Sequence, residues 1–312
     1  MQIVIRISLL FFGFFLANTV FSADTKSYCE STREMFAHCV KPSKTNSDIR
    51  KFDDDHWITF DYSVTVPHPP LLVFMPGTGG TPPGPKMYLE AAAKLGYRVI
   101  SLAYNDDPAV VAYCVKIPDP TCSQNFRQMR AYGDSTISDD SIKNTVAESI
   151  SVRLVSLLNY LNQKYPKDNW GEYLTGNEPN WARIALTGQS QGAGMAAYIA
   201  KQKSVARVIL FSSPWDFYKD PEGKNQPAPW LSTPSITPLK KWFGGYHAQE
   251  NAVKMLSIAY ANLRIPANHV HVFSGALPTD GKVPSGNNPY HNQGIRNPDY
   301  LNDWKFFLTE DK

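Results

Sequence analysis

The sequence predicts a doubly wound α/β domain, in which helices cover both faces of a mostly parallel sheet. Short apolar runs typical of strands alternate with amphipathic segments of helical length along most of the chain. The run 71–75 is continuously apolar and stops at a Pro-Gly pair, as expected of a strand buried on both faces. A second apolar run, 184–187, leads directly into the pentapeptide 188–192 at the start of a helical segment.

The expected elements follow one another in a regular order. We expect strands at 57–64, 71–75, 98–103, 184–187, 205–211 and 269–273, and helices at 86–95, 140–164, 192–203, 251–263 and 299–309. Residues 24–55 are polar and are expected to be irregular. Two stretches, 105–138 and 218–240, break the alternation. We interpret the first as an inserted loop and the second as another loop or small lid, both within a single domain spanning 24–312.

The first 23 residues have the pattern of a secretory signal peptide. Arg6 precedes about ten mostly apolar residues, and the small residues Ser22 and Ala23 follow them. The apolar run is shorter than the ~20 residues that a spanning helix needs, which leaves an uncleaved anchor as the alternative. The mature chain is therefore expected to be secreted or periplasmic, with no stable membrane span after removal of the signal.

The composition is that of a globular protein rather than a disordered one. Of the 312 residues, 43% are hydrophobic and 19% are charged. The formal net charge of +3 is too small to indicate a nucleic acid or an anionic membrane as partner. The chain also lacks a basic run with interleaved aromatic residues.

The four cysteines fall into two close pairs, Cys29 with Cys39 and Cys114 with Cys122. Pairing within each pair closes the shortest loops, so we expect two structural disulfides of this connectivity. Disulfides persist in an oxidising compartment, which agrees with export. The spacings of ten and eight residues are not those of metal ligands, so no metal site is expected.

A candidate nucleophile lies in the sequence Gly188-Gln189-Ser190-Gln191-Gly192, which fits the pattern Gly-x-Ser-x-Gly. An expected strand precedes the motif and an expected helix follows it, which is the context of the nucleophile elbow in the α/β-hydrolase fold. Glycines two residues before and after the serine allow the sharp turn. The alternative is a serine that merely caps the helix.

An acyl-transfer site also needs donors for the developing oxyanion. In this fold the first is the backbone N–H after the nucleophile, here Gln191, and the second lies after an earlier strand. The segment Pro76-Gly77-Thr78-Gly79-Gly80 follows the run 71–75, and we favour Thr78 as the second donor. Gly77 and Gly79 would let the backbone approach the substrate. A plain glycine-rich turn is the alternative, and no phosphate-binding motif follows.

His291 is the candidate general base, because the base follows the last strand in this fold. It is the last histidine of the chain and lies in a polar loop before the final helix. The other histidines come too early in the chain or fit structural roles better: His38, His56, His68, His247, His269 and His271. Of these, His247 is also a possible pocket residue.

Two carboxylates compete for the role of the triad acid, which orients the histidine. Glu250 follows the run 242–247, the usual place after the seventh strand. Asp216 follows the expected strand 205–211, a position that some lipases use. The sequence favours Glu250 slightly and leaves Asp216 open, with Asp280 a distant third.

The chain resembles a little-characterised group of exported bacterial α/β hydrolases between about Leu71 and His291. The resemblance rests on Trp181-Ala182-Arg183-Ile184 before the serine motif, Val205-Ala206-Arg207-Val208, Ser213-Pro214-Trp215-Asp216, and the stretch from Thr237-Pro238 to His247-x-x-Glu250. Position 189 is often histidine in related elbows and is glutamine here. The resemblance implies the α/β-hydrolase fold and the nucleophile, and says almost nothing about the substrate.

These features predict a serine hydrolase that cleaves a carboxylic ester through an acyl-enzyme on Ser190, without a metal or organic cofactor. The expected partner is a small-molecule or lipid-like ester. A peptidase, amidase or lipase with the same triad is one alternative, and a catalytically silent binding protein is another. Four aromatic residues form either an apolar acyl pocket or ordinary core: Trp215, Phe217, Trp230 and Tyr246.

Overall fold

The computed structural model describes residues 27–115, 117–133, 137–277 and 288–310. Its centre is an eight-stranded sheet in the order β1-β2-β4-β3-β7-β8-β11-β12. The strands are β1 (Met35–Val40), β2 (His56–Asp61), β3 (Leu71–Met75), β4 (Arg98–Ser101), β7 (Ile184–Gln189), β8 (Arg207–Phe211), β11 (Trp242–His247) and β12 (Val270–Phe273). Strand β2 is antiparallel to both neighbours, and the pairs from β4 to β12 are parallel. The predicted doubly wound sheet is thus confirmed.

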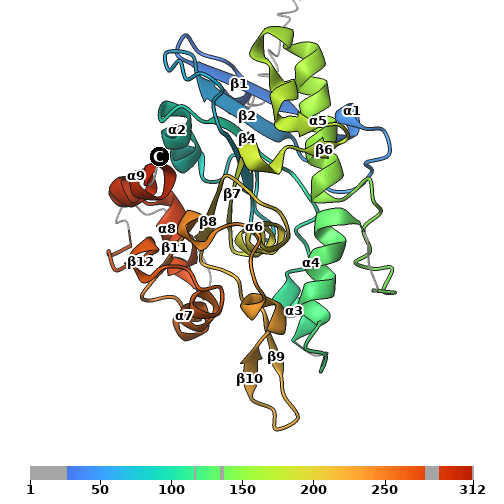
Figure 1. Cartoon of the computed structure of the whole chain (residues 1–312), viewed down its shortest axis with the longest axis vertical. Helices are drawn as coiled ribbons and strands as arrows, with labels where there is room; N and C mark the ends of the chain where they lie inside the picture. The colour runs from blue at the N-terminus through green and yellow to red at the C-terminus, as the bar shows by residue number, and fades with distance from the viewer. Residues whose placement is uncertain (1–26, 116, 134–136, 278–287, 311–312) are drawn as a thin grey trace, which may run out of the picture.

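Helices pack on both faces of this sheet (Figure 1). The helices of the described residues are α1 (Pro42–Thr45), α2 (Lys86–Lys94), α3 (Val110–Cys114), α4 (Cys122–Tyr132), α5 (Ile150–Lys164), α6 (Gln191–Gln202), α7 (Val253–Asn262), α8 (Gln293–Arg296) and α9 (Leu301–Thr309). Among them, no helix has the length and apolar character that crossing a membrane requires.

Strand β3 shows how the sequence builds two cores. Its side chains alternate in direction, as in any strand. Leu71, Val73 and Met75 join the core formed with α5, α6 and α7, whereas Leu72 and Phe74 join the one formed with α2 and α9. Because both faces are covered, all five residues are buried, which explains why the run is continuously apolar.

The sequence predicted that the stretch 24–55 is irregular, and the structure corrects this in part. Residues Met35–Val40 form β1, an edge strand that pairs with β2. Only Phe36 and Val40 of this strand are fully buried, so its sequence lacks the apolar alternation that would have revealed it. The expected signal peptide and Asp280 lie outside the described residues.

The insertion at 105–138 contains two helices, which corrects the prediction of a loop. Helices α3 and α4 occupy much of it and enclose a small core of their own around Phe126 and Met129. The following helix α5 begins at Ile150 rather than at 140, because Ser149 caps it and residues before it form turns. The insertion at 218–240 contains the hairpin β9 (Phe217–Lys219) and β10 (Asn225–Pro227), which projects from the body of the molecule (Figure 1).

Both expected disulfides are present in the structure. Cys29–Cys39 ties the start of the described chain to β1, and Cys114–Cys122 joins the end of α3 to the start of α4. No cysteine of the described residues is free.

His56 at the start of β2 makes folding sensitive to acid. Its side chain is fully buried, and its Nδ1 accepts a hydrogen bond from the Ala103 N–H at 3.0 Å. Burial, and then the charge of Arg153, lower the pKa of His56 from 6.5 to about 3. In the unfolded chain the imidazole of His56 is therefore protonated below about pH 6.5, whereas in the folded chain it stays neutral down to about pH 3.

We expect His56→Asn to weaken the acid destabilisation of the protein. The amide oxygen can replace Nδ1 as acceptor, but the variant has no imidazole to protonate on unfolding. The free energy of unfolding of the wild type should lose up to about 1.4 kcal/mol per pH unit through this residue as pH falls from 6 to 4. Urea titrations at several pH values measure the slope, and equal slopes for the two proteins would contradict the assignment.

Candidate active site

Ser190 lies at the turn between β7 and α6, where the backbone is strained. Its φ is 53° and its ψ is −123°, a conformation that non-glycine residues rarely adopt. The Ser190 N–H donates to the Phe211 carbonyl at 2.9 Å and so fixes the turn against β8. The side chain is partly exposed at the carboxyl edge of the sheet.

Glycine is required on either side of this turn because backbone atoms of neighbouring segments approach too closely for a side chain. A Cβ on Gly192 would lie 1.9 Å from the Met75 carbonyl oxygen, and one on Gly188 would lie 2.4 Å from the Gly192 carbonyl carbon. The spacing Gly-x-Ser-x-Gly thus reflects the packing of Gly192 against the end of β3 and of Gly188 against the start of α6.

The glycine-rich loop after β3 lies beside the serine. A Cβ on Gly77 would be 3.0 Å from the Cβ of Ser190, and the Gly80 N–H closes a turn onto the Gly77 carbonyl at 2.8 Å. Among the hydrogen bonds of the described residues, none is donated by the backbone N–H of Thr78 or of Gln191. Both groups are therefore available to a bound oxygen.

His291 lies in the short helical turn Pro289–Asn292, next to the elbow. Its backbone carbonyl accepts a hydrogen bond at 3.4 Å from the side-chain amide of Gln189, the residue before the serine. The ring of Trp215 packs edge-on against the imidazole, with centroids 5.1 Å apart. The imidazole is partly exposed, as a group that exchanges protons with a substrate must be.

Glu250 is the carboxylate that contacts His291. Its Oε2 lies 2.7 Å from Nδ1 of the imidazole, and its side chain is fully buried. The other oxygen, Oε1, accepts hydrogen bonds from the Ser212 hydroxyl at 2.6 Å and from the His247 N–H at 2.9 Å. The carboxylate is thereby held in one orientation, facing the ring.

Asp216, the rival carboxylate, is engaged elsewhere. It forms a two-pronged ion pair with Arg127 of α4, with Nε to Oδ2 at 2.6 Å, and both side chains are fully buried. The indole N–H of Trp230 donates to the same Oδ2 at 2.9 Å. The sequence left the choice between the two acids open, and of these two the structure places Glu250, not Asp216, against the histidine.

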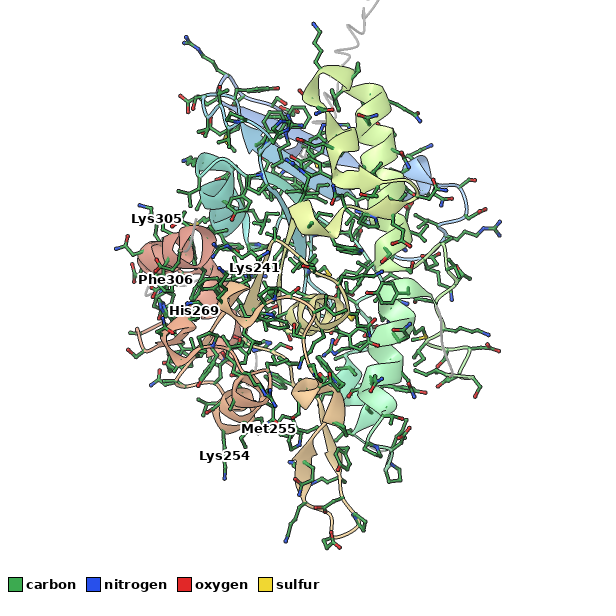
Figure 2. All side chains as sticks on the ribbon, in the orientation of Figure 1. Lys241, Lys254, Met255, His269, Lys305 and Phe306 are labelled. Carbon is green, nitrogen blue, oxygen red and sulfur yellow. A yellow bond between two sulfur atoms is a disulfide. The ribbon has the colours of Figure 1, made fainter. Side chains whose placement is uncertain are left out.

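The remaining histidines of the described residues have structural partners. His247 stacks on Tyr290, its Nε2 lies 2.8 Å from the Gly275 carbonyl, and its Nδ1 accepts from the Gln249 N–H. The ring of His269 stacks on that of Phe243. It also lies near Phe306 of α9, and both of these residues are labelled in Figure 2.

His38, His68 and His271 also lie apart from the serine. His68 pairs with Glu172 at 3.0 Å, and His271 pairs with Asp303 at 2.6 Å. Burial, followed by the charge of Lys164, lowers the pKa of His38 to about 4.

The aromatic residues considered for an acyl pocket divide between two environments. Phe217, Trp230 and Tyr246 are buried in the main core, whereas Trp215 is half-buried next to His291. A cavity of about 410 Å³ borders the glycine-rich loop, and its walls include Thr78, Gly79, Tyr104, Asp54, Asp106 and Asp107. In the part of the chain that the structure describes, no group of three or more His, Cys, Asp or Glu residues is arranged to hold a metal ion.

The strand order, the single reversed strand β2 and the serine at the sharp turn after the fifth strand of the sheet together identify the architecture. The fold is the α/β-hydrolase fold. No protein-family model matches the chain, and no curated protein matches it.

Solved structures resemble the chain only distantly. S-formylglutathione hydrolase from Staphylococcus aureus has 10% identity and a TM-score of 0.47, with 88% of this chain and 99% of that chain covered. A bacterial heroin esterase has 14% identity and a TM-score of 0.45, covering 90% and 87%. Inhibited esterase B from Lactobacillus rhamnosis has 13% identity and a TM-score of 0.45, covering 89% and 87%.

Sequence reasoning missed two residues that support the site: Ser212 and Arg127. Ser212 carries a positive φ of 57° directly after β8, and its hydroxyl reaches Glu250. No local pattern marks such a residue. Arg127 had a weak signal, because a charged residue among the apolar positions of a helix is expected to find a buried partner.

Proposed function

We propose that this protein is a serine hydrolase that cleaves carboxylic esters through an acyl-enzyme on Ser190. The observation that supports it most is the 2.7 Å contact between His291 and the buried carboxylate of Glu250, in the loop beside the serine turn. A partly exposed imidazole that a buried carboxylate orients next to a strained serine is the arrangement expected of a general base.

In the first half of the reaction, Ser190 Oγ attacks the ester carbonyl carbon while His291 Nε2 accepts the hydroxyl proton. Glu250 holds Nδ1–H, which fixes the tautomer with a free Nε2 and stabilises the imidazolium that forms. The N–H groups of Thr78 and Gln191 hold the oxyanion. The imidazolium then returns its proton to the departing alkoxide, which leaves as the alcohol.

In the second half, a water molecule replaces the alcohol. His291 takes a proton from the water as its oxygen attacks the acyl carbon, and the proton passes to Ser190 Oγ as the acyl–oxygen bond breaks. The products are a carboxylic acid and the regenerated serine. The proposed chemistry is carried by side chains and backbone of this chain, and no cofactor takes part.

The substrate proposed is a small-molecule or lipid-like ester. The cavity of about 410 Å³ beside Thr78 could receive one of its two groups, and a volume of this size suits a compact group. Trp215 offers an apolar surface beside His291.

We also propose that the protein acts outside the cytoplasm. Two disulfides close loops of ten and eight residues, and such bonds persist where the surroundings are oxidising. The signal-peptide pattern in residues 1–23 supports the same proposal.

Labelling with a fluorophosphonate probe tests the proposed function. We expect the wild-type protein to be labelled covalently and Ser190→Ala not to be, because only an activated serine displaces fluoride from phosphorus. Failure to label the folded wild type would indicate a silent member of this fold. Turnover of a panel of p-nitrophenyl esters and p-nitroanilides of matched acyl groups then separates an esterase from an amidase, since we expect the esters alone to be cleaved rapidly.

A further inference from the structure

Ser212, directly after β8, has a left-handed backbone conformation. Its φ is 57°, a region that residues other than glycine rarely enter. The residue is only 1% exposed, and its N–H donates to the Gly245 carbonyl of β11 at 3.0 Å. The backbone of Ser212 is thus fixed against the strand that precedes Glu250. A buried serine in this conformation points to a use for its side chain, because glycine would adopt the same backbone without strain.

The hydroxyl of Ser212 is the group that glycine could not supply. It donates to Oε1 of Glu250 at 2.6 Å, and both side chains are buried. The other donor to Oε1 is the His247 N–H at 2.9 Å, at the end of β11. Because both donors engage Oε1, the second oxygen, Oε2, is left for Nδ1 of His291 at 2.7 Å. The contacts thus assign a separate task to each oxygen of the carboxylate.

The carbonyl of Ser212 makes a second contact near the triad. It accepts a hydrogen bond at 2.9 Å from the indole N–H of Trp215, whose ring packs edge-on against the imidazole of His291. Ser212 therefore contacts the triad acid through its hydroxyl and the neighbour of the triad base through its carbonyl. Substitution of the side chain removes the first contact alone, because the carbonyl belongs to the backbone.

Resting on the proposed function, we infer that Ser212 is a positioning residue for the triad, and that its strained backbone serves to direct the hydroxyl to Glu250. Among the described residues, this hydroxyl is the one side-chain group that donates to Oε1. Without it, the carboxylate would keep only a backbone donor at Oε1 and could turn about its last bond. Fewer molecules would then hold the imidazole of His291 in the orientation that proton transfer from Ser190 requires.

The other titratable groups near the Glu250 carboxylate do not replace the hydroxyl. Burial, and then the charge of Glu250, raise the pKa of Tyr260 in α7 well above its usual value, so this phenol stays neutral. The imidazole of His247 contacts backbone groups instead. In the segment after β8, Asp216 is paired with Arg127. The donors at Oε1 are therefore the groups that favour the ionised carboxylate beside the triad base.

Two substitutions that remove the same hydroxyl test this role on the full chain. Ser212→Ala keeps a side chain at positive φ, whereas Ser212→Gly relieves the strain. We expect both variants to lower kcat for a p-nitrophenyl ester about 10- to 100-fold with little change in KM, as loss of a hydrogen bond to a charged group implies. The melting temperature of Ser212→Gly should exceed that of Ser212→Ala by about 2 °C. Because glycine adopts this backbone freely, Ser212→Gly remains a folded test even if Ser212→Ala is unstable.

The pH profile of kcat/KM distinguishes positioning of the triad from a general effect on the fold. We expect its acidic limb to move to higher pH by about 0.5 to 1 unit in both variants, because loss of a donor to the ionised carboxylate favours protonation of the coupled acid and base. Thr59→Val is the matched control. It also removes a buried hydroxyl, which donates to the Phe36 carbonyl at 2.7 Å, and it should leave kcat and the profile unchanged.

The possible outcomes separate the two proposals. Wild-type kcat in Ser212→Gly would overturn the positioning role, because strain in the turn rather than the hydroxyl would then explain any loss in Ser212→Ala. A lowered kcat with an unshifted acidic limb would overturn it as well, since the hydroxyl would not act on the ionisation of the triad. A wild type with neither turnover nor fluorophosphonate labelling would instead overturn the proposed function, and this inference with it.

Discussion

Glu250→Gln is expected to lower kcat about 10⁴-fold while the protein remains folded. The glutamine carbonyl can still accept the bonds that Ser212 and the His247 N–H give to Oε1. The amide NH₂ then faces Nδ1 of His291 and donates to it, which forces the proton onto Nε2. The imidazole in this tautomer cannot accept the serine proton, and no negative charge stabilises its protonated form.

Steady-state kinetics and circular dichroism of the same preparation check this expectation. Asp303→Asn is a matched control, because Asp303 also contacts an imidazole Nδ1, that of His271, at 2.6 Å. This control should retain full kcat, since His271 lies on a different part of the sheet edge. If Glu250→Gln kept more than a tenth of the wild-type kcat, another residue would have to be the triad acid.

Arg127→Ala is expected to cost about 3–5 kcal/mol in the free energy of unfolding. The substitution leaves the Asp216 carboxylate fully buried with only the Trp230 N–H as a side-chain donor. It also removes a contact between α4 and the start of α6, where an Arg127 N–H lies 3.4 Å from the Gln191 carbonyl. Urea denaturation monitored by tryptophan fluorescence measures the loss.

The double variant Arg127→Met, Asp216→Leu provides the control for this prediction. Removing both charges eliminates the buried uncompensated carboxylate, so most of the lost stability should return. A double variant as unstable as Arg127→Ala would show that the arginine contributes through packing rather than through its charge.

Much of the sheet and the serine turn could be predicted because their physical causes are local. The strand 71–75 is apolar throughout since both of its faces are covered. Gly192 is needed where the turn meets the end of β3, and Gly188 where it meets the start of α6. The position of His291 after the last strand followed from the order of elements in this fold. These features lie within a few residues of the pattern that predicts them.

The features that escaped prediction depend on contacts between distant residues. Strand β1 is half-exposed, and it exists because β2 offers it a partner. Helices α3 and α4 form around a small core that only the folded insertion creates. The choice between Glu250 and Asp216 could not be made from either sequence neighbourhood, because an arginine about ninety residues away decides it.

Arg127 connects the insertion at 105–138 to the choice of the triad acid. In an architecture where a carboxylate after either of two neighbouring strands can serve the histidine, α4 neutralises one of them and so leaves the task to the other. In a relative without an arginine at the place of Arg127, the carboxylate at the place of Asp216 would have no ion-pair partner. That carboxylate could then serve as the triad acid, with the serine and the histidine unchanged. A peripheral insertion of such a chain would then govern how its catalytic centre is assembled.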